Sequence, residues 1–247
     1  MKIIPLSEGT FTIDKTKLFV PFNEETDVLK NRPAGSLLVE VQPFIVITSE
    51  DVLLLDTGLG FTNDNGVLQL HDNMMKAGIN PSEVTKVLLS HLHKDHAGGA
   101  GLENKSTGEI KVAFPQATYY IQKKELDFAF EKGLPSFVPT ELECLKNAPQ
   151  VHLLDGNGVI NGYIRYEVTA AHSPYHQVFT IVDGGETVFF GADDAPQLYQ
   201  MKTRFVAKYD YNGKKCMELR QQWWEKGHQE HWRFLFYHDI KSPELKA

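Results

Sequence analysis

The chain has 247 residues, of which 23% are charged and 42% hydrophobic, so one large domain or two small ones fit, and wholesale disorder is excluded. Its formal charge of −7 argues against a nucleic-acid-binding protein, and no apolar run approaches the roughly 18 residues of a membrane span. Two distant cysteines, Cys144 and Cys216, and an N-terminus without a signal-peptide pattern make a reducing cytoplasm the default localisation.

The first half of the chain predicts several short strands, because runs rich in Val, Ile and Leu are bounded by Gly, Pro and Asp. They comprise residues 36–41, 44–48, 52–56, 84–90 and 118–121. The run at 84–90 is apolar, as is typical of a strand that is covered on both faces. Two helices are expected, one at 66–77 with Gly78 as its stop and one at 140–147.

The second half predicts a further group of strands and one long helix. The strands are residues 163–170, 177–182, 187–190 and 233–237, and the helix is residues 212–226. The two central strands form a hairpin around Asp183-Gly184-Gly185, and Gly227 is expected to end the helix. Because no repeat or linker divides the chain, we expect a single domain over residues 1–247, of mixed α and β class with large sheets.

One short run, His91-Leu92-His93-Lys94-Asp95-His96, places three imidazoles and a carboxylate within six residues. Imidazole and carboxylate are ligands of zinc, iron and manganese. Residues two apart in an extended segment point the same way, so His91 and His93 would face one metal ion, and Asp95 and His96 a neighbouring one. Such a pattern would arise by chance about 0.001 times in a chain of this composition. A metal site is therefore expected here.

Several strand-like runs each end in a His or an Asp. These residues are Asp56, His91, His172, Asp193 and His238. If the strands share an orientation, their carboxyl ends meet at one edge of a sheet, which is where α/β folds place ligands. Any one of them alone would be read as a turn or core residue, but together they predict a polar site.

These motifs resemble those of the metallo-β-lactamase superfamily of hydrolases. The matching segments are Leu55-Asp56-Thr57-Gly58, the run 91–96, His172-Ser173-Pro174-Tyr175-His176, Gly191-Ala192-Asp193 and His238-Asp239. The resemblance implies an α/β fold, an αββα sandwich of two mixed β-sheets flanked by helices. It also implies two divalent metal ions at one edge, with zinc favoured and iron or manganese as alternatives.

By the family pattern, each metal-site residue receives a role. The first metal ion would be held by His91, His93 and His172, the second by Asp95, His96 and His238, and Asp193 would bridge them together with a water or hydroxide. Asp56 would orient a ligand imidazole, and His176 would be a buried supporting residue. Asp95 and Asp193 are the catalytic candidates, and either Asp95 or a metal-bound water would pass a proton to the leaving group.

The sequence departs from the family pattern at two places. The usual Gly-Asp is here Gly191-Ala192-Asp193-Asp194, so Asp194 remains the alternative bridging residue. Tyr175 replaces a usually small residue, which makes it a candidate for lining the substrate cleft. An Asp bridge, in place of a Cys, speaks against the true zinc β-lactamases and matches the lactonases, thioesterases and phosphodiesterases of the superfamily.

The resemblance implies hydrolysis of a small molecule, with a lactone or other ester favoured. Residues 6–22 are similar to the entry strands of acyl-homoserine-lactonase-like members. The other cleft candidates are Tyr199, Phe19 and Phe22, for which plain packing is the alternative. No nucleic-acid or membrane partner is expected, and a homodimer remains open.

Two other activities of the same scaffold remain as alternatives. A thioesterase of glyoxalase-II type would need a basic cluster near the C-terminus, and Lys241 and Lys246 look like an ordinary solvated tail. An iron-dependent oxidoreductase of this superfamily usually adds a flavodoxin domain, for which 247 residues leave no room.

Overall fold

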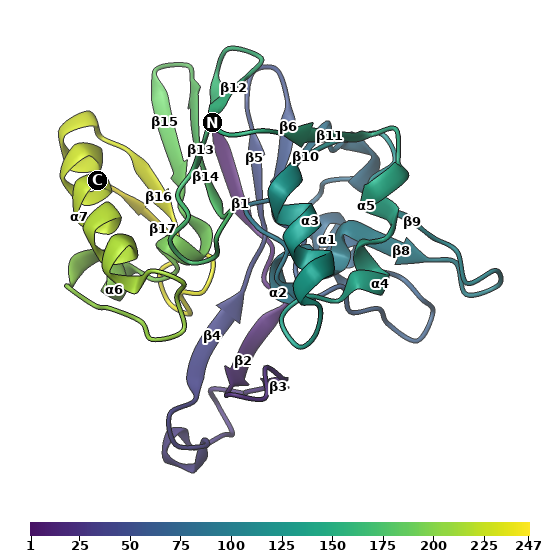
Figure 1. Cartoon of the computed structure of the whole chain (residues 1–247), viewed down its shortest axis with the longest axis horizontal. Helices are drawn as coiled ribbons and strands as arrows, with labels where there is room; N and C mark the ends of the chain where they lie inside the picture. The colour runs from purple at the N-terminus through teal and green to yellow at the C-terminus, as the bar shows by residue number, and fades with distance from the viewer.

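Two six-stranded sheets pack against each other in the computed structural model, which describes residues 1–247, and helices cover both outer faces (Figure 1). Both sheets contain parallel and antiparallel neighbours. The predicted αββα sandwich is therefore confirmed.

The first sheet has the order β1-β5-β6-β7-β10-β11. Its strands are β1 (Lys2–Pro5), β5 (Phe44–Ile47), β6 (Val52–Leu55), β7 (Lys86–Leu88), β10 (Thr118–Gln122) and β11 (Val151–Leu154). Strands β6 and β7 are parallel, with Leu55 opposite Leu88. The residues that follow these two strands therefore emerge at the same edge.

The second sheet has the order β12-β13-β14-β15-β16-β17. Its strands are β12 (Gly158–Ile160), β13 (Ile164–Val168), β14 (Gln177–Asp183), β15 (Glu186–Phe190), β16 (Arg233–Leu235) and β17 (Glu244–Lys246). Strand β14 is antiparallel to both β13 and β15, and β16 is parallel to β15. Strands β13, β15 and β16 therefore all end at one edge.

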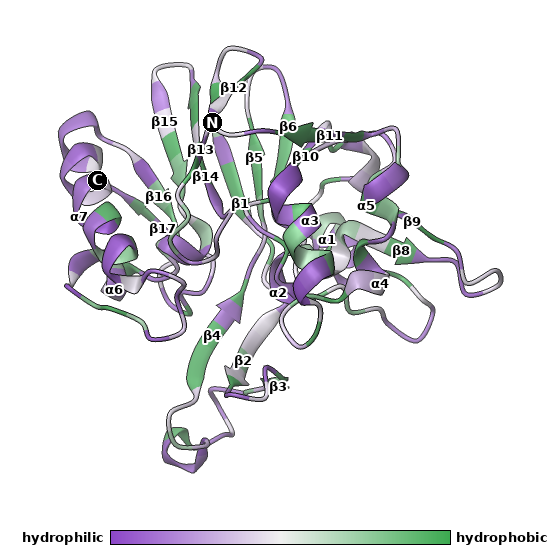
Figure 2. Ribbon diagram, in the orientation of Figure 1, coloured by the Kyte–Doolittle hydropathy of each residue, from purple (hydrophilic) through white to green (hydrophobic).

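Three apolar clusters separate the four layers. One lies between the first sheet and the helices α1 (Gln69–Lys76), α3 (Lys123–Lys132), α4 (Pro139–Leu142) and α5 (Cys144–Asn147), one between the sheets, and one between the second sheet and α7 (Gly213–Glu230). Along β6, Leu54 belongs to the first cluster, and Leu53 and Leu55 to the second. Because both faces of the strand are buried, its sequence is a continuous apolar run, and Figure 2 shows the central strands as the apolar interior.

An arm of three strands projects from the sandwich (Figure 1). It has the order β3-β2-β4, with β2 (Gly9–Ile13), β3 (Phe19–Pro21) and β4 (Leu37–Val41), and the segment between β3 and β4 contains the 3-10 turn η1 (Leu29–Asn31). The inner end of β4 is buried, whereas the outer end is exposed. The arm therefore extends the wall of the molecule beside the edge where the polar residues emerge.

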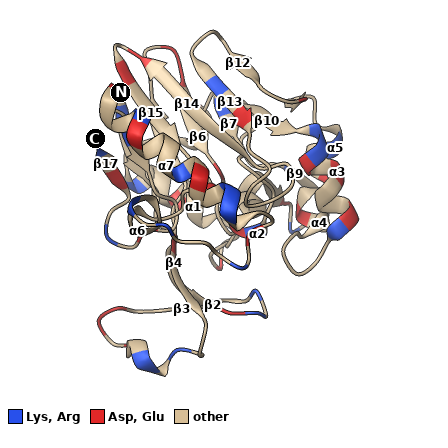
Figure 3. Cartoon of the chain, turned by 60° about the vertical axis from the view of Figure 1, so that its left-hand side comes forward, with Lys and Arg blue, Asp and Glu red and all other residues tan.

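The remaining elements are short. They are α2 (Lys94–Ala97), α6 (Leu198–Lys202), the hairpin β8 (Gly101–Glu103) and β9 (Ile110–Val112), and the 3-10 turns η2 (Pro81–Glu83), η3 (Gly98–Ala100) and η4 (Ala192–Asp194). Acidic and basic residues are interspersed on the outer helices (Figure 3). None of the helices combines the length and the apolar composition that a membrane crossing requires.

Several predicted boundaries were wrong. The helix expected at 66–77 begins at Gln69, because Gly66 adopts a left-handed turn with φ +76°. The helix expected at 140–147 is two short helices, α4 and α5. The strands at 84–90 and 233–237 are only three residues each. One domain over residues 1–247 remains our interpretation.

Gly227 does not end the long helix, as the sequence predicted. It lies inside α7, where a Cβ atom would come 2.1 Å from the ring of Phe234. The helix continues to Glu230 and ends at His231, whose backbone is left-handed with φ 56°. Gly227 is therefore required by the close packing of the helix on the sheet.

Candidate metal centre

Each candidate ligand follows one of the strands that end at the shared edge. His91 follows β7, His172 follows β13, Asp193 lies in the turn after β15, and His238 follows β16. His93 lies immediately before α2, and Asp95 and His96 lie within it. The parallel directions of the strands thus bring together residues that are up to 147 positions apart in the sequence, from His91 to His238.

The ligand atoms form two groups, within each of which all atoms lie within 4.8 Å of one another: His91, His93, His172 and Asp193, and then Asp95, His96 and His238. In the first group, His93 Nδ1 lies 2.9 Å from His91 Nε2 and 3.2 Å from His172 Nε2. In the second, Asp95 Oδ2 lies 3.7 Å from His96 Nε2 and 3.5 Å from His238 Nε2. Either group has the donor types and the number of donors that a zinc ion takes.

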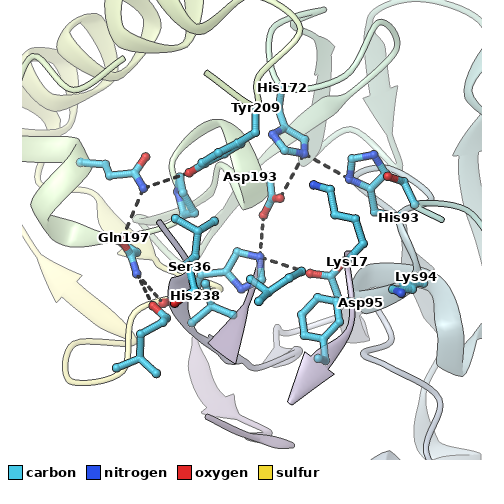
Figure 4. Close-up of a pocket in the computed structure, with 18 of the residues that line it drawn as sticks. Lys17, Ser36, His93, Lys94, Asp95, His172, Asp193, Gln197, Tyr209 and His238 are labelled. Atoms are coloured by element: carbon cyan, nitrogen blue, oxygen red, sulfur yellow. Dashed lines mark hydrogen bonds and ion pairs between the residues drawn. The ribbon is translucent and has the colours of Figure 1, made fainter. Parts of the chain in front are cut away.

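Asp193 lies between the two groups (Figure 4). Its Oδ2 is 3.1 Å from His172 Nε2, in the first group. Its Oδ1 is 3.1 Å from His96 Nε2 and 2.9 Å from His238 Nε2, in the second. One carboxylate oxygen therefore faces each group, which is the arrangement that a bridging ligand needs.

The Nδ1 atoms of three of these imidazoles are paired outside the cluster. His96 Nδ1 lies 2.8 Å from Asp56 Oδ2, His172 Nδ1 lies 2.8 Å from Asp210 Oδ1, and His238 Nδ1 lies 2.6 Å from the carbonyl oxygen of Glu40. A proton on each Nδ1 donates to these acceptors, so the Nε2 lone pairs face inward.

Asp56 is itself held in a fixed position. It adopts a left-handed conformation with φ 56° directly after β6. Its carboxylate accepts hydrogen bonds from the backbone N–H and the hydroxyl of Ser90, both at 2.7 Å. The structure thus places Asp56 where the sequence expected it, behind a candidate ligand imidazole.

The inward-facing atoms fit a cation. His96 Nε2 and Asp193 Oδ1 are buried without a well-aligned hydrogen-bond partner, although the two atoms lie 3.1 Å apart. Burial and the neighbouring imidazoles of His96 and His93 hold the pKa of His91 well below its ordinary value. Burial would raise the pKa of Asp193, but the imidazoles of His96 and His238 hold it well below its usual range. Neutral imidazole and ionised carboxylate are the forms that bind metal ions.

Asp194 points away from this cluster. Its Oδ2 lies 3.0 Å from His176 Nδ1, and its Oδ1 accepts hydrogen bonds from the backbone N–H of His172 at 2.7 Å and from the thiol of Cys216 at 3.5 Å. Asp194 and His176 are fully buried. Both residues therefore support the loop that carries His172, and of the two aspartates only Asp193 belongs to the two ligand groups.

A cavity of about 340 Å³ opens onto the candidate ligands. His93, Asp95, His172, Asp193 and His238 form its floor, and the arm contributes part of its wall (Figure 4).

Of the four cleft residues that the sequence predicted, the structure places one in the cavity wall. Phe19 lines the cavity, whereas Tyr175, Tyr199 and Phe22 are not among its lining residues. Tyr175 packs against Phe128, and Tyr199 is 67% exposed on α6. The tyrosine in the cavity wall is Tyr209, which lies in an irregular segment before α7.

Sequence reasoning missed Tyr209, Asp210, Lys17 and Arg32. They lie in three irregular segments, between β2 and β3, between β3 and β4, and before α7, where no periodicity singles out a residue. Asp210 precedes Tyr211 and Asn212, whose N–H groups donate to the carbonyl oxygens of His172 and Ala171. Tyr209 and Asp210 reach the site only because these two loops, which are far apart in the sequence, pair with each other.

Several known proteins are similar to this chain. The N-acyl homoserine lactonase AiiA of Bacillus thuringiensis subsp. kurstaki is 23% identical over 164 residues, which cover 59% of each chain. The matched segments span 16% to 59% of the lengths of the curated lactonases. Among solved structures, a probable metal-dependent hydrolase from Staphylococcus aureus has a TM-score of 0.77 and 19% identity, covering 99% of this chain and 91% of its own. AidC, a dizinc quorum-quenching lactonase, has a TM-score of 0.73 and 22% identity, and the match covers 99% of this chain and 89% of AidC.

The fold, the order of the motifs and the two ligand groups agree with a family match. Residues 39–212 match the metallo-beta-lactamase superfamily, and this region includes the strands and loops that carry all but one of the candidate ligands. The chain belongs to the metallo-beta-lactamase superfamily.

Proposed function

We propose that this protein is a dinuclear metal-dependent hydrolase that cleaves a lactone or another ester-like bond in a small molecule. The observation that carries this proposal is the position of Asp193, one oxygen of which faces each of two histidine-containing groups. The lactonases among the similar proteins support the choice of an ester bond.

The proposed metal ions are two zinc ions, with iron or manganese as alternatives, because imidazole and carboxylate donors suit all three. His91, His93 and His172 would hold one ion, Asp95, His96 and His238 the other, and Asp193 both. When bound, such a pair polarises the carbonyl oxygen of the substrate and lowers the pKa of a water molecule.

The residues of the chain supply orientation and proton transfer. Asp56 and Asp210 fix the rings of His96 and His172 through their Nδ1 atoms. Hydrolysis adds a hydroxyl to the acyl carbon and a proton to the leaving oxygen. Asp95 lines the cavity. The backbone carbonyl oxygen of Asp95 accepts a hydrogen bond from the hydroxyl of Tyr237 at 2.6 Å. We assign to Asp95 the transfer of the proton to the leaving oxygen.

Tyr209 is the candidate for orienting the substrate. Its side chain lines the cavity, and its ring centroid is 6.3 Å from that of His172. Burial raises the pKa of Tyr209 to about 12, so its hydroxyl keeps its proton near neutral pH. It can therefore donate a hydrogen bond to a carbonyl oxygen of the substrate.

Metal analysis of the purified protein, coupled to a hydrolysis panel, tests the proposal. The panel contains acyl-homoserine lactones, a simple lactone, a glutathione thioester, a phosphodiester and a nitrocefin-type lactam. We expect about two metal ions per chain, hydrolysis of an ester or lactone, and loss of activity in Asp193→Asn and His91→Ala. One iron ion per chain without hydrolysis would favour an oxidative enzyme, and no metal after reconstitution would refute the proposal.

Lys241 and Lys246 are not among the residues that line the cavity, so they do not supply the basic cluster that the thioesterase alternative would need near the C-terminus. A homodimer and a cytoplasmic location remain predictions.

A further inference from the structure

Three cationic side chains line the cavity that contains the candidate ligands: Lys17, Arg32 and Lys94. None of them lies within 4.0 Å of a carboxylate oxygen. The only carboxylates in the cavity wall are Asp95 and Asp193, which face the imidazoles. The wall is therefore cationic in a chain whose formal charge is −7.

Arg32 is the least satisfied of these cations. Its Nε and Nη1 atoms are buried and have no hydrogen-bond partner. The hydroxyl of Ser36, which also lines the cavity, is buried without a partner as well. Leaving buried donors unpaired is costly, and the planar guanidinium matches the paired oxygens of a carboxylate or phosphate. These donors are therefore positioned for an anionic acceptor.

Lys17 faces the candidate ligands directly. In Figure 4 its side chain extends toward three of the candidate ligands, His93, His172 and Asp193. Lys94 lies on the same wall, with its ammonium 5.7 Å from the centre of the Phe19 ring.

We propose that the substrate of this site carries a carboxylate or phosphate group beside the scissile ester bond, and that Arg32 and Lys17 bind this group. The inference rests on the proposed hydrolase function. With two divalent ions bound, the positive charge in the cavity would far exceed the negative charge of its two carboxylates. An anionic substrate would balance this excess. A neutral acyl lactone would leave the donors of Arg32 and Ser36 unpaired.

A matched series of lactones tests this. The ring is γ-butyrolactone with a γ-hydroxymethyl group, with a γ-carboxylate, or with the phosphate ester of the hydroxymethyl group, so that the two sources of negative charge are compared with one neutral ring. We expect kcat/KM to be about tenfold higher for at least one anionic lactone than for the neutral one. In Arg32→Gln the ratio of kcat/KM for the anionic lactone to kcat/KM for the neutral lactone should fall about tenfold, mainly because KM for the anionic lactone rises. Arg32→Lys should restore part of this ratio. Lys30→Gln, an exposed residue outside the cavity, is the control and should leave the ratio unchanged.

Binding to metal-depleted protein gives a second readout. The carboxylated lactone opens to 2-hydroxyglutarate, and unsubstituted γ-butyrolactone opens to 4-hydroxybutyrate. In calorimetry we expect 2-hydroxyglutarate to bind more tightly than 4-hydroxybutyrate, and Arg32→Gln to weaken it about tenfold, with Lys30→Gln unaffected.

The two proposals can fail separately. Equal hydrolysis of all three lactones, with a ratio that Arg32→Gln does not change, would overturn the anion site and leave the hydrolase. Binding of 2-hydroxyglutarate that depends on Arg32, without hydrolysis of any ester, would support the anion site and refute the proposed function. Equal binding by wild type and Arg32→Gln would overturn the anion site.

Discussion

His172 and Asp210 form a buried pair, in which His172 Nδ1 lies 2.8 Å from Asp210 Oδ1. The side chain of Asp210 is only 2% exposed. The pair turns His172 Nε2 toward Asp193 Oδ2, 3.1 Å away. Asp210 therefore acts on the candidate metal centre through His172, without contacting the cluster itself.

Asp210→Asn should weaken metal binding. The substitution keeps an acceptor for His172 Nδ1 but removes the negative charge that makes the imidazole a stronger ligand. Loss of such a partner typically costs about 10- to 100-fold in metal affinity. Competition with a chelator would measure the change, with Asp64→Asn as the exposed control. Equal affinities in the two variants would show that Asp210 only fills space.

Asp193→Asn and Asp194→Asn form a second matched pair. We expect Asp193→Asn to lower the metal content and abolish hydrolysis, because one oxygen faces each ligand group. Asp194→Asn should retain the metal ions and lose about 2 kcal/mol of stability, since it breaks the charged contact with His176. Metal analysis and denaturant unfolding of both variants separate the two roles. A loss of metal from Asp194→Asn alone would reverse the assignment.

The fold was largely predictable because its signals are local. The apolar runs of β6 and β7 and the Gly-Gly turn between β14 and β15 each act over a few residues. The position of Gly227 shows the limit: its packing against Phe234 comes from the sheet, and no local pattern carries that information.

The candidate ligands were predictable for a related reason. His91, Asp193 and His238 each end an apolar strand, so strand direction alone places them at one edge. Tyr209 and Asp210 depend on how an irregular loop folds back over His172, which the residues of the loop do not specify. For the same reason the sequence directed attention to Tyr199, which the structure leaves exposed.

Tyr209→Phe should lower kcat/KM for the hydrolysed ester by about 3- to 10-fold, the effect of one lost hydrogen bond. The substitution removes only the hydroxyl and keeps the ring against His172. Tyr199→Phe is the control, because that side chain lies outside the cavity. Initial rates over a range of substrate concentrations would measure both variants. If the two variants behave alike, Tyr209 has no part in binding the substrate.

Glu8→Gln should change how stability depends on pH. Glu8 is buried, and its Oε2 accepts a hydrogen bond from the backbone N–H of Leu59 at 2.6 Å, while Oε1 has no partner. Burial raises the pKa of Glu8 to about 7, with a smaller contribution from the charge of Asp95. The folded chain therefore keeps this proton to a higher pH than the unfolded chain, in which the carboxyl ionises near its ordinary value of 4.5.

Because the folded state binds more protons between these two values, Glu8 lowers stability progressively as the pH rises from about 4.5 to above 7, by about 3 kcal/mol in all. Glutamine cannot ionise, so Glu8→Gln should gain stability relative to wild type over that range and show no such gain below it. Denaturant unfolding at pH 4.5, 6 and 8 measures the difference, with the exposed Glu50→Gln as the control. A difference between Glu8→Gln and wild type that is the same at all three pH values would mean that folding does not raise the pKa of Glu8.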